Sequence, residues 1–319
     1  MLVRVVKNWD SPDLFQQMPT DLKDSNICFT LDEVDDCDVL IILNYLKQPI
    51  QVNCPADNIW AIMQEPYIPG VFGWMVEKHE AYAQVFTHSP PNAHLRYHAF
   101  YPALPWHVNK SYQQLVDAIV PTKTKTISWI TSNKLNFPGH KKRMQFYQFL
   151  KSQNQLSVDF FGKGIQFIED KWDALAPYSY ALAIENSTTT HYWTEKLADC
   201  FLSYTLPFYY GCQNIEDYFP KDSFILIDIT KPNDALHIIQ TAIENKEWEK
   251  RFEAIKEARQ LILNRYNFFH FVKARIEELK VSSLNKKQHQ LDIYKPSINQ
   301  KCIKKITGLK NKIYTSISQ

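Results

Sequence analysis

Short apolar runs bounded by polar turns recur along the whole chain and constrain its fold more than any other feature. They cover residues 3–6, 39–43, 59–63, 84–87, 126–131, 158–161, 180–184, 206–210 and 224–228. Several are apolar throughout, which is typical of parallel strands that are covered on both faces. Helical periodicity occupies residues 112–119, 144–153, 194–204, 235–244, 248–263 and 268–280. This alternation predicts an α/β fold built from βαβ units with doubly wound sheets.

A chain of 319 residues is long enough for two domains of ordinary size. Residues 102–125 contain Pro105, Pro121 and a run of alternating Lys and Thr, and they separate two sets of predicted strands. We therefore predict an N-terminal Rossmann-like domain at 1–121, a C-terminal domain at 122–280 and a tail at 281–319. In such folds ligands bind at the carboxyl ends of the strands, here facing a cleft between the domains.

Several familiar cofactor and metal motifs are missing from the sequence. The chain has seven glycines, and Gly162-Lys163-Gly164 lacks the third glycine of a dinucleotide fingerprint. The ten histidines form no zinc-binding pattern. Asp36-Cys37-Asp38 precedes a predicted strand, so we interpret it as a solvated acidic turn and expect no metal. The six cysteines form no CxxC, no apolar run is long enough to cross a bilayer, and no signal peptide opens the chain. We expect a reduced, cytoplasmic protein.

The stretch from Glu185 to Lys196 changes from apolar to polar where a predicted strand ends. Thr194 can cap a helix that begins at Glu195, and the amides of the first turn would then favour an anion. Lys196 adds a positive charge, so together these groups suit a diphosphate. Glu195 can accept hydrogen bonds from sugar hydroxyls, and Tyr192 can donate to a phosphate oxygen. The alternative is an ordinary helix start with solvated Glu195 and Lys196, and spacing alone does not decide between the two.

A second basic stretch follows another predicted strand. Ser132-Asn133 comes directly after residues 126–131, and Lys141-Lys142-Arg143 precedes a helical run. A strand, a polar loop and a basic helix start again suit phosphate. A solvated basic turn is the alternative, and it fits Lys141 and Lys142 better than Arg143.

Glu65 follows the predicted strand 59–63, at the carboxyl end where a ligand would bind. A carboxylate in that position can act as a general base. The alternative is a loop carboxylate that caps a local turn. Aromatic residues are frequent in 67–74 and 90–106, and these loops are candidates for stacking on sugar rings.

These motifs together resemble a known family. Glu185-Asn186-Ser187, then Tyr192, then Thr194-Glu195-Lys196 strongly resemble the donor-binding signature of the α-1,3/4-fucosyltransferases, family 10 of the glycosyltransferases, in its bacterial form. The resemblance extends over roughly residues 126–230. It includes Ser132-Asn133, Arg143-x-x-Phe146-Tyr147, Tyr178-Ser179-Tyr180, the segment 206–211 and the segment 223–225.

The resemblance implies a GT-B-like fold of two Rossmann-like domains and an inverting transfer of L-fucose from GDP-fucose to a hydroxyl of a glycan. It implies an α-1,3 linkage and a surface polysaccharide or lipopolysaccharide as acceptor. Glu65 stands where the family has the general base of a Gly-Glu-Asn triplet, here Gln64-Glu65-Pro66. Fixed cations and amides would stabilise the diphosphate, so we expect no cofactor and no essential metal. The donor would be bound by Asn133, Arg143, Asn186, Tyr192, Thr194, Glu195 and Lys196.

Two alternatives to this function remain open. The donor can be another GDP-6-deoxyhexose or a related GDP-sugar. Alternatively, the chain is a non-catalytic protein that binds a glycan or a sugar nucleotide, which the altered neighbours of Glu65 allow.

The C-terminal segment is strongly basic. Residues 281–319 hold eight lysines and one acid, a net charge of +7, which leaves −5 on the rest of a chain whose net charge is +2. Apolar residues at 303, 306, 309 and 313 alternate with lysines, which is typical of an amphipathic segment on an anionic membrane. We therefore predict peripheral contact with the inner membrane face through 286–313, and no nucleic-acid binding because the body is acidic. The alternative is a disordered, solubilising tail.

Overall fold

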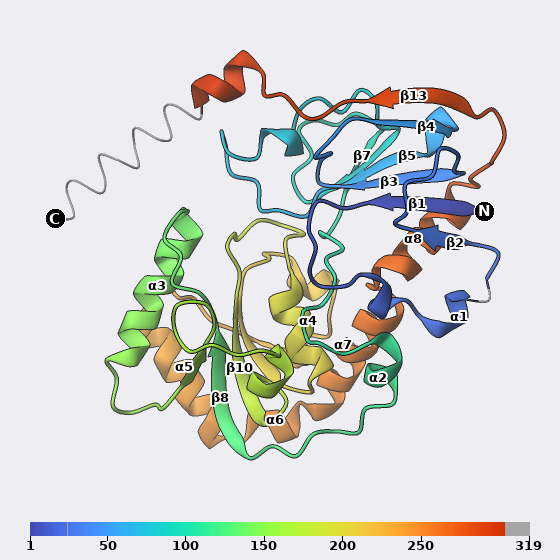
Figure 1. Ribbon diagram of the computed structural model, residues 1–319. Coiled ribbons are helices and arrows are strands. Elements are labelled where there is room, and N and C mark those ends of the chain that lie inside the picture. The colour runs from blue at the N-terminus through green and yellow to red at the C-terminus, as the bar shows by residue number, and fades with distance from the viewer. Residues whose placement is uncertain (24, 304–319) are drawn as a thin grey trace. The chain divides into compact units, whose positions relative to one another are not determined.

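The computed structural model describes residues 1–23 and 25–303, which form two compact units (Figure 1). Of the described residues, unit 1 comprises 1–10, 25–102 and 273–303, and unit 2 comprises 11–23 and 103–272. This division differs from the predicted boundaries at 121 and 280. The chain returns to unit 1 near its C-terminal end, so the units are not consecutive in sequence.

Unit 1 is built on a six-stranded sheet in the order β2-β1-β3-β5-β6-β7. Every neighbouring pair in it is parallel. The central strands β3 and β5 are buried along their whole length, as their unbroken apolar sequences predict. The strands are β1 (Leu2–Val6), β2 (Cys28–Thr30), β3 (Val39–Leu43), β5 (Ile59–Ile62), β6 (Gln84–Thr87) and β7 (Tyr97–Ala99).

A separate two-stranded sheet ties the C-terminal segment to unit 1. Strand β13 (Lys287–Leu291) pairs antiparallel with β4 (Ile50–Cys54), and Leu291 is buried against the apolar cluster of this unit. Just before β13, Lys286 forms ion pairs with Asp36 and with Asp38, the latter at 2.8 Å. The expected tail is therefore folded into unit 1 over its described part, and residues 304–319 lie outside the described residues. The acidic turn predicted at 36–38 therefore forms ion pairs with Lys286.

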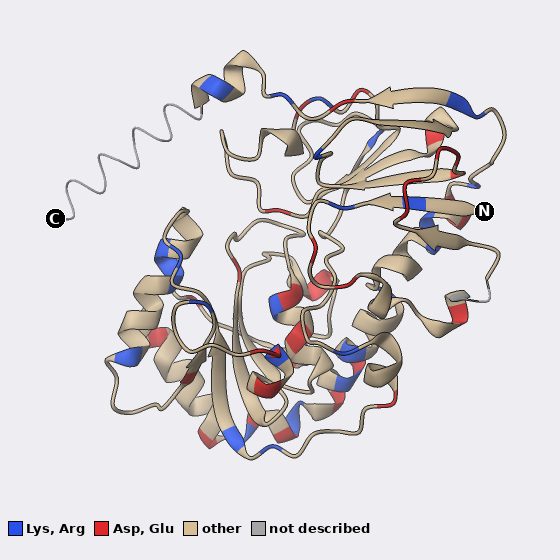
Figure 2. Ribbon diagram, viewed as in Figure 1, with Lys and Arg blue, Asp and Glu red and all other residues tan. Residues whose placement is uncertain are grey.

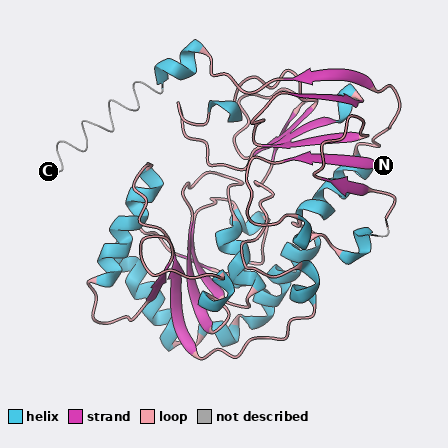
Figure 3. Cartoon of the chain, in the orientation of Figure 1, coloured by secondary structure: helices cyan, strands magenta, loops and turns pink. Residues whose placement is uncertain are grey.

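Unit 2 contains a parallel five-stranded sheet in the order β12-β11-β10-β8-β9. Helices cover this sheet, as Figure 3 shows. The strands are β8 (Lys125–Ile130), β9 (Asp159–Phe161), β10 (Tyr178–Ile184), β11 (Leu206–Tyr210) and β12 (Ile225–Leu226). The helices of the described residues include α1 (Thr20–Lys23), α2 (Tyr112–Val116), α3 (Pro138–Lys151), α4 (Glu195–Leu202), α5 (Pro232–Glu244), α6 (Glu247–Lys250), α7 (Phe252–Asn264) and α8 (Phe268–Glu278). Short 3₁₀ turns occur at Phe15–Gln17, Ala56–Asn58, Gly73–Met75, Lys171–Ala174, Ile215–Asp217 and Lys221–Ser223.

The order of this sheet reverses direction between β8 and β10. From β8 the chain passes through α3 to β9 on one side, whereas from β10 it passes through α4 to β11 on the other. The crevice at the carboxyl ends of two such strands is where open α/β sheets bind ligands. The polar stretches predicted to bind a phosphate follow these two strands, β8 and β10.

Helix α3 begins earlier than its periodicity predicts. Pro138 occupies the first turn, where its missing N–H and fixed φ are tolerated. The inner face of the helix buries Phe146, Tyr147 and Leu150 in the core of unit 2, against Trp129 of β8. Arg143 consequently lies inside the helix, one turn after its start, and not ahead of it.

Among the described residues, none of the helices combines the length and the apolar character that a bilayer crossing requires. The same residues contain no group of three His, Cys, Asp or Glu side chains arranged to hold a metal ion.

Candidate active site

The first turn of α3 lies directly against the chain that leaves β10. A Cβ atom built on Gly139 would lie 2.0 Å from the carbonyl oxygen of Asn186. Any side chain at position 139 would therefore push the helix away from this backbone. The close approach brings Arg143 of α3 next to the polar stretch 185–196.

Arg143 is a buried cation for which the described part of the chain supplies no hydrogen-bond partner. The residue is 5% exposed, and its Nε atom is buried and unpaired among the described residues. Burial lowers the pKa of Arg143, while the negative charges of Glu185 and Glu195 act in the opposite direction. Desolvating a charge without hydrogen bonds is unfavourable, so natural proteins rarely keep such a group except where a ligand completes it. Basic residues mark this end of α3 in Figure 2.

Three more buried polar atoms near Arg143 lack a partner among the described residues. They are Thr131 Oγ1 just after β8, His140 Nδ1 in the first turn of α3, and Asn186 Oδ1 just after β10. Burial and the charge of Arg143 lower the pKa of His140 to about 4, so the imidazole is neutral at neutral pH. Buried polar atoms in folded proteins are nearly always paired. Their concentration at one edge of one sheet indicates a site for a polar ligand.

Lys196 differs from Arg143 because its charge is already paired. Thr194 caps α4, and its N–H donates to Glu185 Oε1 at 2.7 Å. The Nζ atom of Lys196 lies 2.9 Å from Thr194 Oγ1, 3.3 Å from Glu185 Oε2 and 3.1 Å from Glu195 Oε1. The prediction placed Thr194, Glu195 and Lys196 at a helix start, and the structure adds Glu185 as the buried carboxylate on which they converge.

The pKa directions show which of these groups carry charge. Burial raises the pKa of Glu185, whose carboxylate has no exposed surface. Burial also acts against the charge of Lys196, but the two carboxylates outweigh it and raise its pKa. The pKa of Glu195 is held well below its usual value despite burial, chiefly by Lys196 and then by His107 and Lys171. The network is therefore a fixed set of charges with little positive charge left over. Within residues 1–23 and 25–303, no ion pair neutralises the nearby charge of Arg143.

The structure brings together most of the residues predicted to bind the donor. Arg143, Asn186, Glu195 and Lys196 meet at the β8–β10 edge, and Tyr192 is buried close enough to act on the charge of Arg143. Asn133 lies in the loop after β8, exposed, with its side chain against Gly164.

Three further residues at this site, His140, Lys171 and Asp199, have no role predicted from the sequence. Lys171 bridges Glu195 at 3.9 Å and Asp199 at 3.2 Å, and so supports the start of α4 from outside. Their signals in the sequence are weak, because Lys171 and Asp199 lie in different elements and become partners only through the fold.

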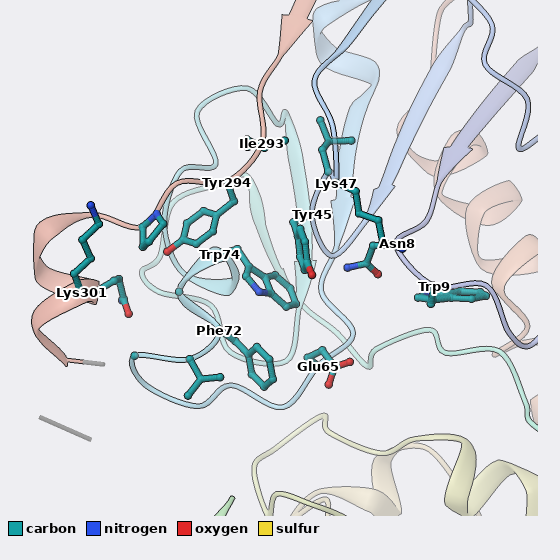
Figure 4. A pocket seen from close by; sticks show the side chains of 16 residues that line it. Asn8, Trp9, Tyr45, Lys47, Glu65, Phe72, Trp74, Ile293, Tyr294 and Lys301 are labelled. Carbon is teal, nitrogen blue, oxygen red and sulfur yellow. The ribbon is translucent and has the colours of Figure 1, made fainter. Parts of the chain in front are cut away.

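The predicted base, Glu65, lies in unit 1 after β5. It lines a pocket of about 710 Å³. Figure 4 shows Glu65 at the edge of this pocket, next to the aromatic side chains of Phe72 and Trp74. Gln64 and Pro66, which stand where the family triplet has Gly and Asn, are both buried, whereas Glu65 between them is exposed. Gln64 Oε1 accepts hydrogen bonds from Trp9 Nε1 at 3.1 Å and from Asn44 Nδ2 at 3.3 Å. Gln64 thus fixes Trp9 beside the pocket that Glu65 enters.

Comparison with known proteins decides the family. Residues 120–299 match glycosyltransferase family 10 (fucosyltransferase), C-terminal part. The chain belongs to glycosyltransferase family 10. The resemblance identified from the sequence is confirmed, and the match extends from before β8 to beyond β13.

Curated relatives of this family 10 protein include 4-galactosyl-N-acetylglucosaminide 3-alpha-L-fucosyltransferase 9 of Mus musculus and of Homo sapiens. Each is 29% identical over 146 residues, which cover 42% of this chain and 39% of the relative. The corresponding fucosyltransferase FUT6 of Pongo pygmaeus is 31% identical over 124 residues, 37% of this chain and 33% of the relative. The alignments thus span about two fifths of the relatives or less.

A solved structure described as α1,3-fucosyltransferase with GDP shares the fold of this family 10 chain. Its TM-score is 0.50 at 16% sequence identity, and the alignment covers 83% of this chain and 92% of the other. The predicted α/β, GT-B-like architecture of two Rossmann-like units is confirmed.

Proposed function

We propose that this protein is an inverting fucosyltransferase that transfers L-fucose from GDP-fucose to a hydroxyl of a glycan. Membership of family 10 supports the reaction class. The observation that carries the proposal is the buried Arg143 at the switch point of the unit 2 sheet, whose Nε atom has no hydrogen-bond partner among the described residues. A diphosphate would supply the hydrogen-bond acceptors that this site lacks.

In the proposed reaction Glu65 takes the proton of the acceptor hydroxyl, and the hydroxyl oxygen attacks the anomeric carbon of fucose. The bond from that carbon to the β-phosphate oxygen breaks, and GDP leaves with the electron pair. Arg143 and the positive end of the α4 dipole would stabilise the charge that develops on the leaving diphosphate. We propose that Asn186 and Tyr192 contact the donor and that Glu195 binds ribose or fucose hydroxyls. Asn133, in the exposed loop after β8, is also proposed to contact the donor.

We propose further that the transfer requires no metal. Guanidinium and backbone amide donors can stabilise a leaving diphosphate in place of a cation. Activity that persists after dialysis against a chelator is the expected result, and a strict requirement for added Mg²⁺ or Mn²⁺ would overturn it.

The linkage, the acceptor and the location of the protein are also proposals. The names of the relatives support an α-1,3 linkage. The basic C-terminal segment supports a surface polysaccharide or lipopolysaccharide as the acceptor. A cytoplasmic enzyme in contact with the inner membrane face would suit that acceptor. Lys286, however, is paired with Asp36 and Asp38, so membrane contact would have to use other lysines.

The experiment is a transfer assay with GDP-fucose and a panel of acceptor oligosaccharides, starting with a 4-galactosyl-N-acetylglucosaminide, with the linkage of each product assigned by NMR. Preferential use of GDP-mannose or another GDP-sugar would favour the alternative donor. Binding of GDP-fucose without transfer or hydrolysis would favour a non-catalytic protein.

Glu65→Gln tests the base in the same assay. Loss of general base catalysis should lower kcat by about 10²–10⁴ while leaving GDP affinity unchanged. Glu33→Gln, an exposed carboxylate of the same unit, is the control and should retain full activity. Equal activity of Glu65→Gln and wild type would remove Glu65 from the mechanism.

A further inference from the structure

The pocket that contains Glu65 is completed by the chain that returns from β13. This return segment, residues 293–301, contributes Ile293, Tyr294, Pro296, Gln300 and Lys301 to the pocket lining. Figure 4 shows Tyr294 and Lys301 on the side opposite Trp9, with Phe72 and Trp74 between them. The pocket volume of about 710 Å³ lies within the range of natural ligand sites.

The return segment is pinned to unit 1 by Glu77. The Tyr294 hydroxyl donates to Glu77 Oε1 at 2.7 Å, and the Ser297 N–H donates to the same oxygen at 2.9 Å. Burial opposes the charge of Glu77, but these hydrogen bonds prevail and its pKa is lowered. Gly73 allows the return segment to pack closely against unit 1, because a Cβ atom at this position would lie 2.2 Å from the Tyr294 hydroxyl and 3.0 Å from Gln300 Cγ. The segment is a packed wall and not a loose end.

Gln300 contributes a buried amide group to this wall. The residue is 9% exposed, and its Oε1 atom is buried with no hydrogen-bond partner among the described residues. A buried amide oxygen without a donor is unfavourable by about as much as a lost hydrogen bond. Gln300 lines the pocket, so a ligand hydroxyl can supply the missing donor once the buried amide turns toward the pocket.

The aromatic surface beside the return segment suits the rest of a sugar. Tyr45 and Trp74 have ring centroids 5.2 Å apart, and Phe72 meets Trp74 at 5.8 Å, so three aromatic rings form one cluster. A pyranose presents hydroxyls at its rim and C–H groups on its faces. Aromatic rings and an unpaired carbonyl oxygen therefore complement it.

We propose that the return segment 293–301 is a wall of the glycan-acceptor site and that Gln300 is a specificity-determining residue, accepting a hydrogen bond from one hydroxyl of the acceptor sugar. This inference rests on the proposed fucosyltransferase function. It assigns acceptor selection to a C-terminal segment far in sequence from Glu65.

The test compares full-length wild type with Gln300→Met, which keeps the buried volume and removes the oxygen. Asn299→Met, on the exposed neighbouring residue, is the matched control. In the transfer assay Gln300→Met should raise the KM for the acceptor roughly 3–10-fold, with kcat and the KM for GDP-fucose unchanged. Acceptors that lack one hydroxyl at a time identify the hydroxyl that Gln300 binds. For wild type, removing that hydroxyl should raise the KM for the acceptor by the same factor as Gln300→Met does. For Gln300→Met, removing it should raise the KM no further.

Calorimetric titration of the same oligosaccharides, without donor, separates this inference from the proposed function. Glycan binding that weakens in Gln300→Met supports the wall even if no fucose is transferred. A wild type that transfers fucose, with Gln300→Met equal to it for every acceptor, would overturn the inference alone. The inference also fails if no glycan binds either protein.

Discussion

Replacing Arg143 with methionine should separate ligand binding from folding in an unusual way. Most core substitutions destabilise a protein by about 1 kcal/mol or more. Here the free protein keeps a guanidinium that is 5% exposed and has an unpaired Nε, so methionine removes a desolvated charge and breaks no hydrogen bond. The attraction of Glu185 and Glu195 for Arg143 is lost, which offsets part of the gain. We expect the free energy of unfolding without ligand to be unchanged or higher by about 1–2 kcal/mol.

The effect on ligand binding should be large and opposite in sign. GDP at about 100 times its Kd would stabilise the wild type by about 2.7 kcal/mol, which raises the Tm of a domain of this size by roughly 5–10 °C. Loss of a charge-assisted contact to the diphosphate should weaken GDP binding and slow transfer by about 10²–10³-fold. The Tm shift should then vanish at the same GDP concentration.

Differential scanning fluorimetry with and without GDP measures both effects in one experiment. Lys142→Met, on the exposed face of the same helix, is the control and should keep the wild-type shift. If Arg143→Met melted several degrees lower without ligand, yet kept the full GDP shift, Arg143 would be a structural residue and the assignment of this site would be wrong.

Two further outcomes concern the neighbouring charges. Lys196→Met should lower the free energy of unfolding by about 3–5 kcal/mol in urea titrations, because it removes the cation that neutralises the buried carboxylate of Glu185 and also pairs with Glu195. Adding Glu185→Gln should restore part of the loss, and equal stability of Lys196→Met and wild type would contradict the network. The pKa of His140 is about 4 in the folded chain and about 6.5 when unfolded, so the unfolded state binds more protons between these values and stability should fall as pH drops from about 6.5 to about 4. His140→Gln should flatten the dependence of Tm on pH in that window, and an unchanged slope would count against a buried neutral imidazole.

The central strands could be predicted because their sequences are apolar along their whole length. Residues 39–43 and 180–184 have this character, and the structure places β3 and β10 inside their sheets. The order of the strands could not be predicted in the same way. β8 pairs with β10, which follows it by about fifty residues, although β9 comes between them in the sequence. Local sequence patterns do not indicate which strands pair.

Weakly apolar edge strands were missed for the opposite reason. β13 reads Lys-Gln-His-Gln-Leu, and its pattern resembles a solvated tail, but backbone pairing with β4 holds it in place. The charge count assigned Lys286 to that tail as well. Its partners are Asp36 and Asp38, some 250 residues earlier, and only the fold brings these charges together.

The limits of prediction were similar at the candidate site. The sequence identified Arg143 and Lys196 as two equivalent cations near a phosphate. It could not show that one is already neutralised by Glu185 and Glu195, because burial and side-chain direction decide which charges meet. It also gave no sign that Gly139 allows α3 to touch the backbone of Asn186.

This difference between the two cations suggests a division of roles in the reaction. Lys196 joins the cap of α4 to the buried carboxylate that follows β10, so it keeps the helix start and its amides in position before a ligand arrives. Arg143 has no such partner among the residues that the structure describes, so it can direct its charge at a diphosphate without first breaking one of the described contacts. Preorganised donors stabilise developing charge best when no reorganisation is needed. Variants of Lys196 should therefore lose stability and activity together, whereas variants of Arg143 should lose activity alone.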